Sequence, residues 1–232
     1  MPAVAPVQQV YPAPNRAQFA AEGSYLVVTN PTVGTVVTWV DSGPAGQQAF
    51  VDTGPNFWIH NNEPAGGRTI YLDYVKLIAS KVMTSGVSMQ FAVLLDPVPR
   101  TISTNNMLNV VPVTTASAYP NLATPTILVQ NSATASVFSA SSAMHKNVAR
   151  DCIGGINIAA HVYGITFGDY TASTTSSGNL SDSISAAAPG RCWAQATAIG
   201  INPGTDCSIY FWSPSSVDNI DPEFEIGMIA RP

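Results

Sequence analysis

The sequence predicts an all-β fold, a β-sandwich or barrel built from many short strands. Runs of alternating apolar and polar residues, rich in β-branched and aromatic side chains, recur at short intervals, and turns containing Pro or Gly separate most of them. No window shows the apolar spacing of a capped amphipathic helix, and no helices alternate with the strands as in α/β folds. With 232 residues, of which 46% are hydrophobic, the chain can bury a sizeable core.

The first 18 residues predict an extended N-terminal arm. The four prolines of this segment favour polyproline and β geometry over helix. Its few large apolar groups bury too little surface to order the segment alone, so we expect the arm to lie across a neighbouring subunit. The side chains expected to make this contact are Val4, Val7, Val10 and Tyr11.

Residues 19–232 hold the strand candidates and are expected to form a single domain, because no linker or internal repeat divides them. The candidates are Ser24–Asn30, Thr35–Val40, Asn56–His60, Arg68–Ser80, Val87–Leu95, Leu108–Thr114, Pro125–Gln130, Ile153–Tyr163, Trp193–Ile201, Asp206–Trp212 and Glu223–Ala230.

The most strand-like candidate is Arg68–Ser80, in which Ile70, Leu72 and Tyr74 share one face. The alternation is lost near Lys76, where two apolar residues are adjacent. This irregularity predicts a β-bulge near Lys76 and places that side chain at a solvent-exposed or interface edge.

Three other segments break the strand pattern. Residues 169–191 are small and polar without periodicity, and loops longer than about 15 residues are usually functional or disordered. We expect this loop to be a surface protrusion or a flap that contacts a neighbour, and residues 114–126 to be a shorter loop of the same kind. Ser141–Arg150 is the best helical candidate, although it has no clear apolar stripe.

Charge is scarce and weakly acidic. Charged residues make up 10% of the chain, against roughly 25% in an average soluble domain, and the net charge is −5. The nine basic residues are dispersed, whereas neutralising phosphates requires clustered Lys and Arg, so direct nucleic-acid binding is disfavoured. A surface with so little charge suits a protein that packs against neighbouring subunits.

No apolar run approaches the roughly 20 residues that cross a bilayer, and the N-terminus lacks the positive region of a secretory signal. The three cysteines, Cys152, Cys192 and Cys207, cannot all pair within one chain. Reduced, buried thiols of a protein made in a cytoplasm are therefore expected.

The sequence predicts no enzymatic activity and no cofactor. It contains none of the common hydrolase, metalloprotease, phosphate-binding, dinucleotide-binding or thiol-redox motifs. By residue type, Cys152 and His161 could act as a catalytic nucleophile and its base. Nine residues along one extended strand span about 30 Å, however, so the two side chains cannot meet there.

His60–Glu63 places an imidazole, two amides and a carboxylate in four residues. A metal site is one interpretation, but no second His or Cys lies nearby to complete a zinc site. The favoured interpretation is a turn in which Asn61 and Asn62 cap backbone groups.

Asp218–Glu225 is the densest acidic stretch, with Glu223 and Glu225 on one face of the last predicted strand. Calcium at a subunit interface would use such oxygens. Because the spacing does not match an EF-hand loop, a solvated acidic turn is favoured.

The four tryptophans have two interpretations. On a β-sandwich they could stack sugars, which would make the protein a carbohydrate-binding module or a receptor-binding adhesin. Each lies in an apolar strand pattern, where Trp more often fills a core. They are Trp39, Trp58, Trp193 and Trp212.

Short strands, low charge, unpaired cysteines, an N-terminal arm and a long Ser/Thr/Ala loop together resemble a virion shell protein. The stretch FWIHNNEPAGGRTIYLDYVKLIAS (57–80) and the following MQFAVLLDPVPR (89–100) are similar to segments of bacteriophage jelly-roll structural proteins. The resemblance implies an antiparallel β-sandwich of jelly-roll type, and it supplies no catalytic or ligand-binding residues.

Two roles follow from the resemblance. A capsid cement or decoration protein stabilises an icosahedral head made by another subunit, often as a trimer, whereas a single jelly-roll major capsid protein forms the shell itself. Shell proteins of this type that package RNA commonly carry a basic arm, but this arm has one basic residue, Arg16. We therefore expect a cement protein in a virion assembled in the host cytoplasm, with itself and a major capsid protein as partners.

Overall fold

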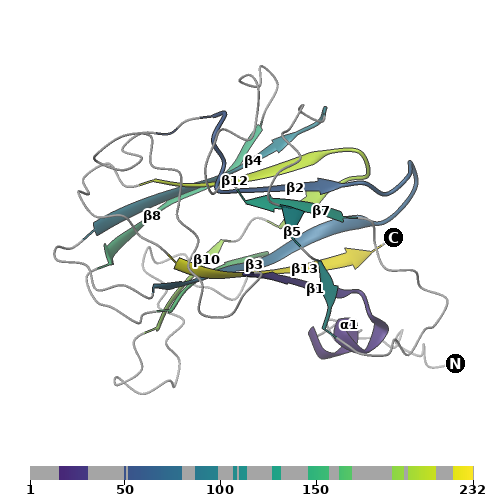
Figure 1. Ribbon diagram of the computed structural model, residues 1–232, viewed down its shortest axis with the longest axis horizontal. Coiled ribbons are helices and arrows are strands. Elements are labelled where there is room, and N and C mark those ends of the chain that lie inside the picture. Colours follow the sequence, from purple (N-terminus) through teal and green to yellow (C-terminus); the bar gives the residue numbers. More distant parts are fainter. Residues whose placement is uncertain are drawn as a thin grey trace, which may run out of the picture.

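The computed structural model of this protein contains two facing β-sheets and one short helix (Figure 1). The residues that it describes are 16–30, 50, 52–79, 87–98, 107–108, 110–113, 127–131, 146–156, 162–168, 190–195, 198–212 and 222–231. Strands make up nearly all of the regular structure in these ranges, so the prediction of an all-β fold is confirmed.

The first sheet, the lower layer of Figure 1, comprises β1 (Tyr25–Thr29), β3 (Thr69–Ala79), β6 (Val111–Pro112), β9 (Val162–Phe167), β10 (Gly190–Gln195), β11 (Ile199–Ile201) and β13 (Pro222–Arg231). Their spatial order is β10-β9-β3-β13-β1-β6, and β11 pairs with the start of β3. The helix α1 (Arg16–Glu22) lies below this sheet, on the side away from the second sheet.

The second sheet comprises β2 (Phe57–Asn61), β4 (Val87–Asp96), β5 (Met107–Leu108), β7 (Ile127–Asn131), β8 (Lys146–Ile156) and β12 (Asp206–Trp212). Their spatial order is β5-β7-β2-β12-β4-β8. Every described strand pair in the two sheets is antiparallel except β9 and β10, which are parallel. The prediction of antiparallel sheets is therefore correct apart from this pair.

The hydrophobic core lies between the two sheets, because alternate residues of each strand point inward. Phe57 of the second sheet packs against Phe224 of the first, with ring centroids 4.7 Å apart, and both are buried. Phe57 also meets the edge of Phe211 at 6.4 Å. Full burial of such a side chain contributes roughly 1.5–3 kcal/mol, and the contact between Phe57 and Phe224 holds the two layers together.

The second sheet is also buried on its other face along β12 and the adjoining part of β4. All seven residues of β12 are buried, although alternate residues must point away from the core. Phe50 packs on this outer face, 4.9 Å from the ring of Tyr210 and 5.6 Å from that of Trp212. The small cluster on this face consists of Ala92, Leu94, Tyr210 and Trp212.

Several predicted boundaries are wrong. The helical candidate Ser141–Arg150 overlaps β8, whose residues pair along β4 from Lys146 onward. Ile153–Tyr163 falls on two strands, β8 and β9, that lie in different sheets. In both cases pairing with a distant strand, which a local pattern does not contain, decides the structure.

Two more candidates are divided. Leu108–Thr114 supplies β5 to the second sheet and β6 to the first, and Trp193–Ile201 supplies β10 and β11. Thr35–Val40, the loop 114–126 and residues 169–189 of the predicted loop 169–191 lie outside the described residues. The last two residues of that predicted loop belong to β10 instead.

The last residues of the predicted arm are helical instead of extended, because α1 begins at Arg16. The helix ends at Gly23, whose φ of 74° is accessible to glycine. The N–H of Gly23 donates to the carbonyl of Ala20, and that of Ser24 donates to the carbonyl of Phe19, each at 3.0 Å. This pair of bonds is a Schellman cap. Alanine-rich sequence and burial of Phe19 against the sheet favour the helix.

Candidate functional site

The outer face of the first sheet carries a β-bulge at Asp73. Gly227 of β13 pairs with Tyr74, while the next residue, Met228, pairs with Leu72, so Asp73 is the extra residue on β3. The predicted bulge near Lys76 is therefore misplaced by three residues. After the bulge Val75 points into the core, and both Asp73 and Tyr74 lie on the outer face.

Asp73 joins the helix to the sheet. The guanidinium of Arg16 donates two hydrogen bonds to this carboxylate, from Nε at 2.7 Å and from Nη2 at 3.0 Å. The hydroxyl of Tyr25 on β1 donates a third bond to Asp73 Oδ2. We call these three residues, Arg16, Tyr25 and Asp73, the anchor site. A bidentate Arg–carboxylate pair fixes the orientation of the guanidinium as well as its distance from the carboxylate. The pair therefore positions the first residue of α1 on the sheet.

At the anchor site, Arg16 and Tyr25 both remain protonated, so both can donate hydrogen bonds to Asp73. The hydrogen bond to Asp73 raises the pKa of Arg16. Burial raises the pKa of Tyr25 well above its ordinary value, and the hydrogen bond to Asp73 adds to that effect. Tyr25 therefore remains a protonated donor at neutral pH.

A second polar group lies next to the anchor site on the same face. The hydroxyl of Tyr74 donates to the carboxylate of Glu225 on β13, which also pairs with Lys76 Nζ at 3.5 Å. Burial, followed by this hydrogen bond, raises the pKa of Tyr74. The Tyr74 ring covers Gly227 so closely that a Cβ at position 227 would overlap it. Lys76 lies on a strand between β9 and β13, so it is not at a sheet edge as predicted.

The helix has a second attachment in its middle. Phe19 is buried, and the guanidinium of Arg231 on β13 lies 4.5 Å from the centre of its ring. Together with the anchor site, this contact holds the first half of α1 against the sheet. Residues 1–15 therefore join the sandwich beside Asp73. Val4, Val7, Val10 and Tyr11 themselves lie outside the described residues.

Two features of the sequence hint at the anchor site. Asp73 stands between two tyrosines within an apolar strand, and Arg16 is the only basic residue in the first 18. Their meeting depends on contacts 57 residues apart, and on a bulge whose position the apolar alternation does not predict.

β6, the last described strand of the first sheet on this side, exposes two apolar side chains. Val111 is 50% exposed and Val113 is 46% exposed. The N–H of Val113 donates to the carbonyl of Tyr25, so by alternation the nitrogen of Pro112 faces away from β1. Because proline has no N–H, β6 offers no outward donor at this position to an added strand.

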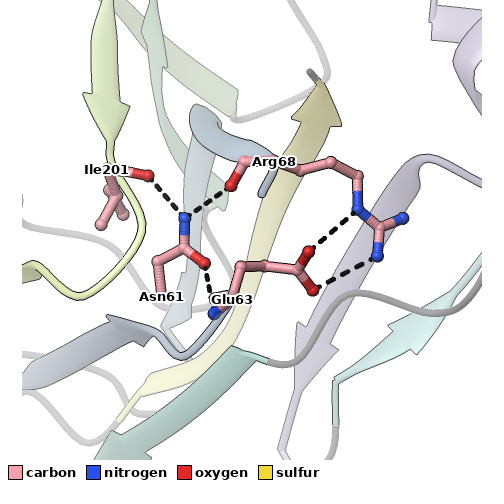
Figure 2. Close-up of polar contacts among 4 residues, drawn as sticks. All are labelled: Asn61, Glu63, Arg68 and Ile201. Atoms are coloured by element: carbon pink, nitrogen blue, oxygen red, sulfur yellow. Dashed lines mark hydrogen bonds and ion pairs between the residues drawn. The ribbon is translucent and has the colours of Figure 1, made fainter. Parts of the chain in front are cut away.

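The predicted cluster His60–Glu63 forms a corner between the two sheets (Figure 2). Asn61 is fully buried, and its amide donates to the carbonyls of Arg68 and Ile201, each at 2.8 Å. Its side-chain oxygen accepts from the N–H of Glu63, whose carboxylate pairs with Arg68 at 3.3 Å. The expected binding of backbone groups by Asn61 is confirmed, whereas the same role for Asn62 stays a prediction. The corner joins β2 to β3 beside the connection from β11 to β12.

His60 lies on the outer face of the second sheet and contacts a carboxylate. Its Nδ1 is 2.6 Å from Asp206 Oδ1, and Asp96 is the cross-strand neighbour of Asp206 on the other side. Ser208 lies two residues further along β12, but its hydroxyl has no hydrogen-bond partner and is fully buried. A substrate has no access to this Ser208 hydroxyl, so the arrangement does not form an open hydrolytic site. The absence of enzymatic activity stays a prediction.

The other candidate residues are separated. Cys207 is a free, buried thiol whose pKa is raised by burial and then by Asp206 and Asp96. Cys152 and Cys192 lie on strands of different sheets, and His161 lies outside the described residues. Among the described residues, no three His, Cys, Asp or Glu side chains gather to hold a metal ion.

The acidic stretch and the tryptophans are described in part. Glu223 and Glu225 share the outer face of β13, as predicted, while Asp218 and Asp221 lie outside the described ranges. Trp58 and Trp212 are 2% and 6% exposed, so these two cannot stack a sugar. Trp39 lies outside the described residues, and Trp193 lies on β10.

Compared with protein-family models, curated proteins and solved structures, the chain matches none. Within the described part of the chain, no helix has both the length and the apolar character to cross a membrane.

Proposed function

We propose that this protein is a virion structural protein, a capsid cement or decoration protein of jelly-roll type. In this role it stabilises an icosahedral phage head by contacts with its own copies, as a trimer, and with a major capsid protein. The observation that carries the proposal is the anchor site. It joins an N-terminal segment of 15 residues to a fixed point on the outer face of a two-layered sandwich.

Three features support a role in which the protein acts by packing against neighbouring subunits. The described sandwich is the architecture that a jelly roll requires. The first 15 residues contain no charged side chain, and their apolar side chains include Val4, Val7, Val10 and Tyr11, which suits docking on another protein surface. The exposed pair Val111 and Val113 adds an apolar contact next to β1. Pro112 favours side-chain packing over strand addition at this edge, so an arm that adds a strand must use another edge.

The single jelly-roll major capsid protein is the alternative within the same class. The one basic residue of the predicted arm, Arg16, is bound to Asp73. In the docked helix its charge is already paired, and one arm cation could neutralise few phosphates of a packaged genome, which favours an outer position for the protein.

Deletion of Met1–Asn15 tests the proposal, because it removes the arm and keeps α1 with Arg16. We expect the truncated subunit to unfold at the wild-type temperature and to bind isolated phage heads more weakly, with lower thermal stability of the heads. Replacing Val4, Val7, Val10 and Tyr11 with Ser should reproduce the loss, whereas replacing Gln8 and Gln9 with Ser should not. Heads that are equally stable with the truncated and full-length subunits would contradict the proposal.

A further inference from the structure

The described contacts attach α1 to the sandwich at its start, in its middle and at its end. At its start, Arg16 pairs with Asp73, although the side chain of Arg16 remains 59% exposed. In its middle, Phe19 is buried and lies under the guanidinium of Arg231. The Schellman cap at Gly23 and Ser24 then joins the helix to β1. Phe19 is the only large apolar side chain that α1 buries.

The helix cannot persist away from the sheet. An isolated helix shorter than about 12 residues is unstable in water, and α1 has seven. Its folding is therefore coupled to its docking. The sheet does not depend on the helix in the same way, because Asp73 keeps its hydrogen bond from Tyr25 when Arg16 leaves. The hydroxyl of Tyr74 likewise keeps its hydrogen bond to Glu225, and Glu225 keeps its ion pair with Lys76.

We propose that α1 is a strap with two states, docked as a helix on Asp73 or released as an extended chain, and that Asp73 sets the balance between them. The sandwich stays folded in both states. Asp73 is suited to this role because its carboxylate lies on the outer face of β3, between the core residues Leu72 and Val75, and is 11% exposed, within reach of a side chain from the helix.

Release changes the length of the N-terminal tether. Seven residues span about 10 Å as a helix and about 23 Å when extended, at roughly 1.5 and 3.3 Å per residue. The released strap therefore lets residues 1–15 reach a neighbour that lies further away. This use of the strap rests on the proposed function, whereas the two states are a property of the isolated subunit.

Amide hydrogen exchange of the purified full-length protein tests the strap. We expect the amides at the end of α1 and at Gly23 and Ser24 to exchange faster than those of β13 and β3 in the wild type. Asp73→Asn should speed exchange in α1 by about five-fold, as expected for a partly exposed ion pair, without changing exchange in the strands. Phe19→Ala should bring α1 to the exchange rates of an unstructured peptide.

Two further variants make the result decisive. Arg16→Gln breaks the same pair from the exposed side, so it tests the strap even if Asp73→Asn disturbs the bulge. Lys76→Gln removes the neighbouring ion pair on the same face without touching α1 and should leave α1 exchange unchanged. The strap is overturned if α1 exchanges as slowly as β13 in the wild type, or if Asp73→Asn and Arg16→Gln both leave its exchange unaltered. Because the measurement needs no second subunit, its outcome is independent of any role in heads.

Discussion

The outer faces of the two sheets carry similar polar side chains but bury them to different extents. On the first sheet, Arg16 and Lys76 are 59% and 35% exposed while they pair with carboxylates. On the second sheet, Asp206 is fully buried and its partner His60 is 13% exposed. The first arrangement can open to solvent at little cost, because water replaces the lost partner. The second cannot, because it would leave a buried carboxylate without its partner.

The aromatic residues show the same contrast. Trp212 and Tyr210 on the second sheet are buried under Phe50, whereas Tyr71 on the outer face of the first sheet is 39% exposed. The second sheet is thus built into the fold on both of its faces. Within the described residues, the outer face of the first sheet is partly exposed at Tyr71, and α1 docks on this face.

Truncating one aromatic residue on each outer face should produce the largest difference. We expect Trp212→Ala to lower the free energy of unfolding by about 3–5 kcal/mol, because it leaves a cavity under Phe50. Tyr71→Ala removes a half-exposed ring and should cost less than about 1 kcal/mol. Urea unfolding followed by circular dichroism measures both. Equal losses would show that the two faces do not differ in burial as described.

The strands of both sheets were largely predictable, but the elements that distinguish the two faces were not. Alternating residues in Arg68–Ser80 and Asp206–Trp212 indicate β3 and β12 directly. The pairing of His60 with Asp206 spans 146 residues, and no local pattern contains it. Tyr74 was assigned to the face of Leu72 by strict alternation, and the bulge at Asp73 moves it to the opposite face.

The helix was missed for a related reason. The prolines up to Pro14 dominate the composition of the N-terminal segment, although Arg16–Glu22 itself is rich in helix-forming residues. Such a short helix forms because the sheet buries Phe19, and sequence alone does not show which surface will be adjacent.

Removing one member of each polar pair, Asp206 with His60 and Arg16 with Asp73, should separate the two faces by a smaller margin. Asp206→Ala breaks a buried contact with His60 and should cost about 3 kcal/mol in the free energy of unfolding. Arg16→Ala breaks the partly exposed pair with Asp73 and should cost less than about 1 kcal/mol. Chemical denaturation of both variants in the same buffer gives the comparison. A loss for Arg16→Ala as large as that for Asp206→Ala would mean that α1 is integral to the fold.

The smallest expected effect concerns alkaline pH and the two tyrosines of the first sheet. Burial, with hydrogen bonds to carboxylates, raises the pKa of both Tyr25 and Tyr74 above their value in the unfolded chain, near 10. Above that pH the unfolded chain loses these protons first, so the folded state holds more protons than the unfolded state. The stabilisation from these hydroxyls is therefore complete below about pH 10 and declines as the pH rises, by at most about 1.4 kcal/mol per pH unit for each group.

We expect the double variant Tyr25→Phe, Tyr74→Phe to lose less stability than the wild type between pH 10 and 11 in urea unfolding. Cys207 titrates in both proteins and leaves their difference unchanged, and Tyr71→Phe, on the exposed ring of the same face, should follow the wild type. If the double variant declines as steeply as the wild type, the two hydroxyls are not held as donors to Asp73 and Glu225.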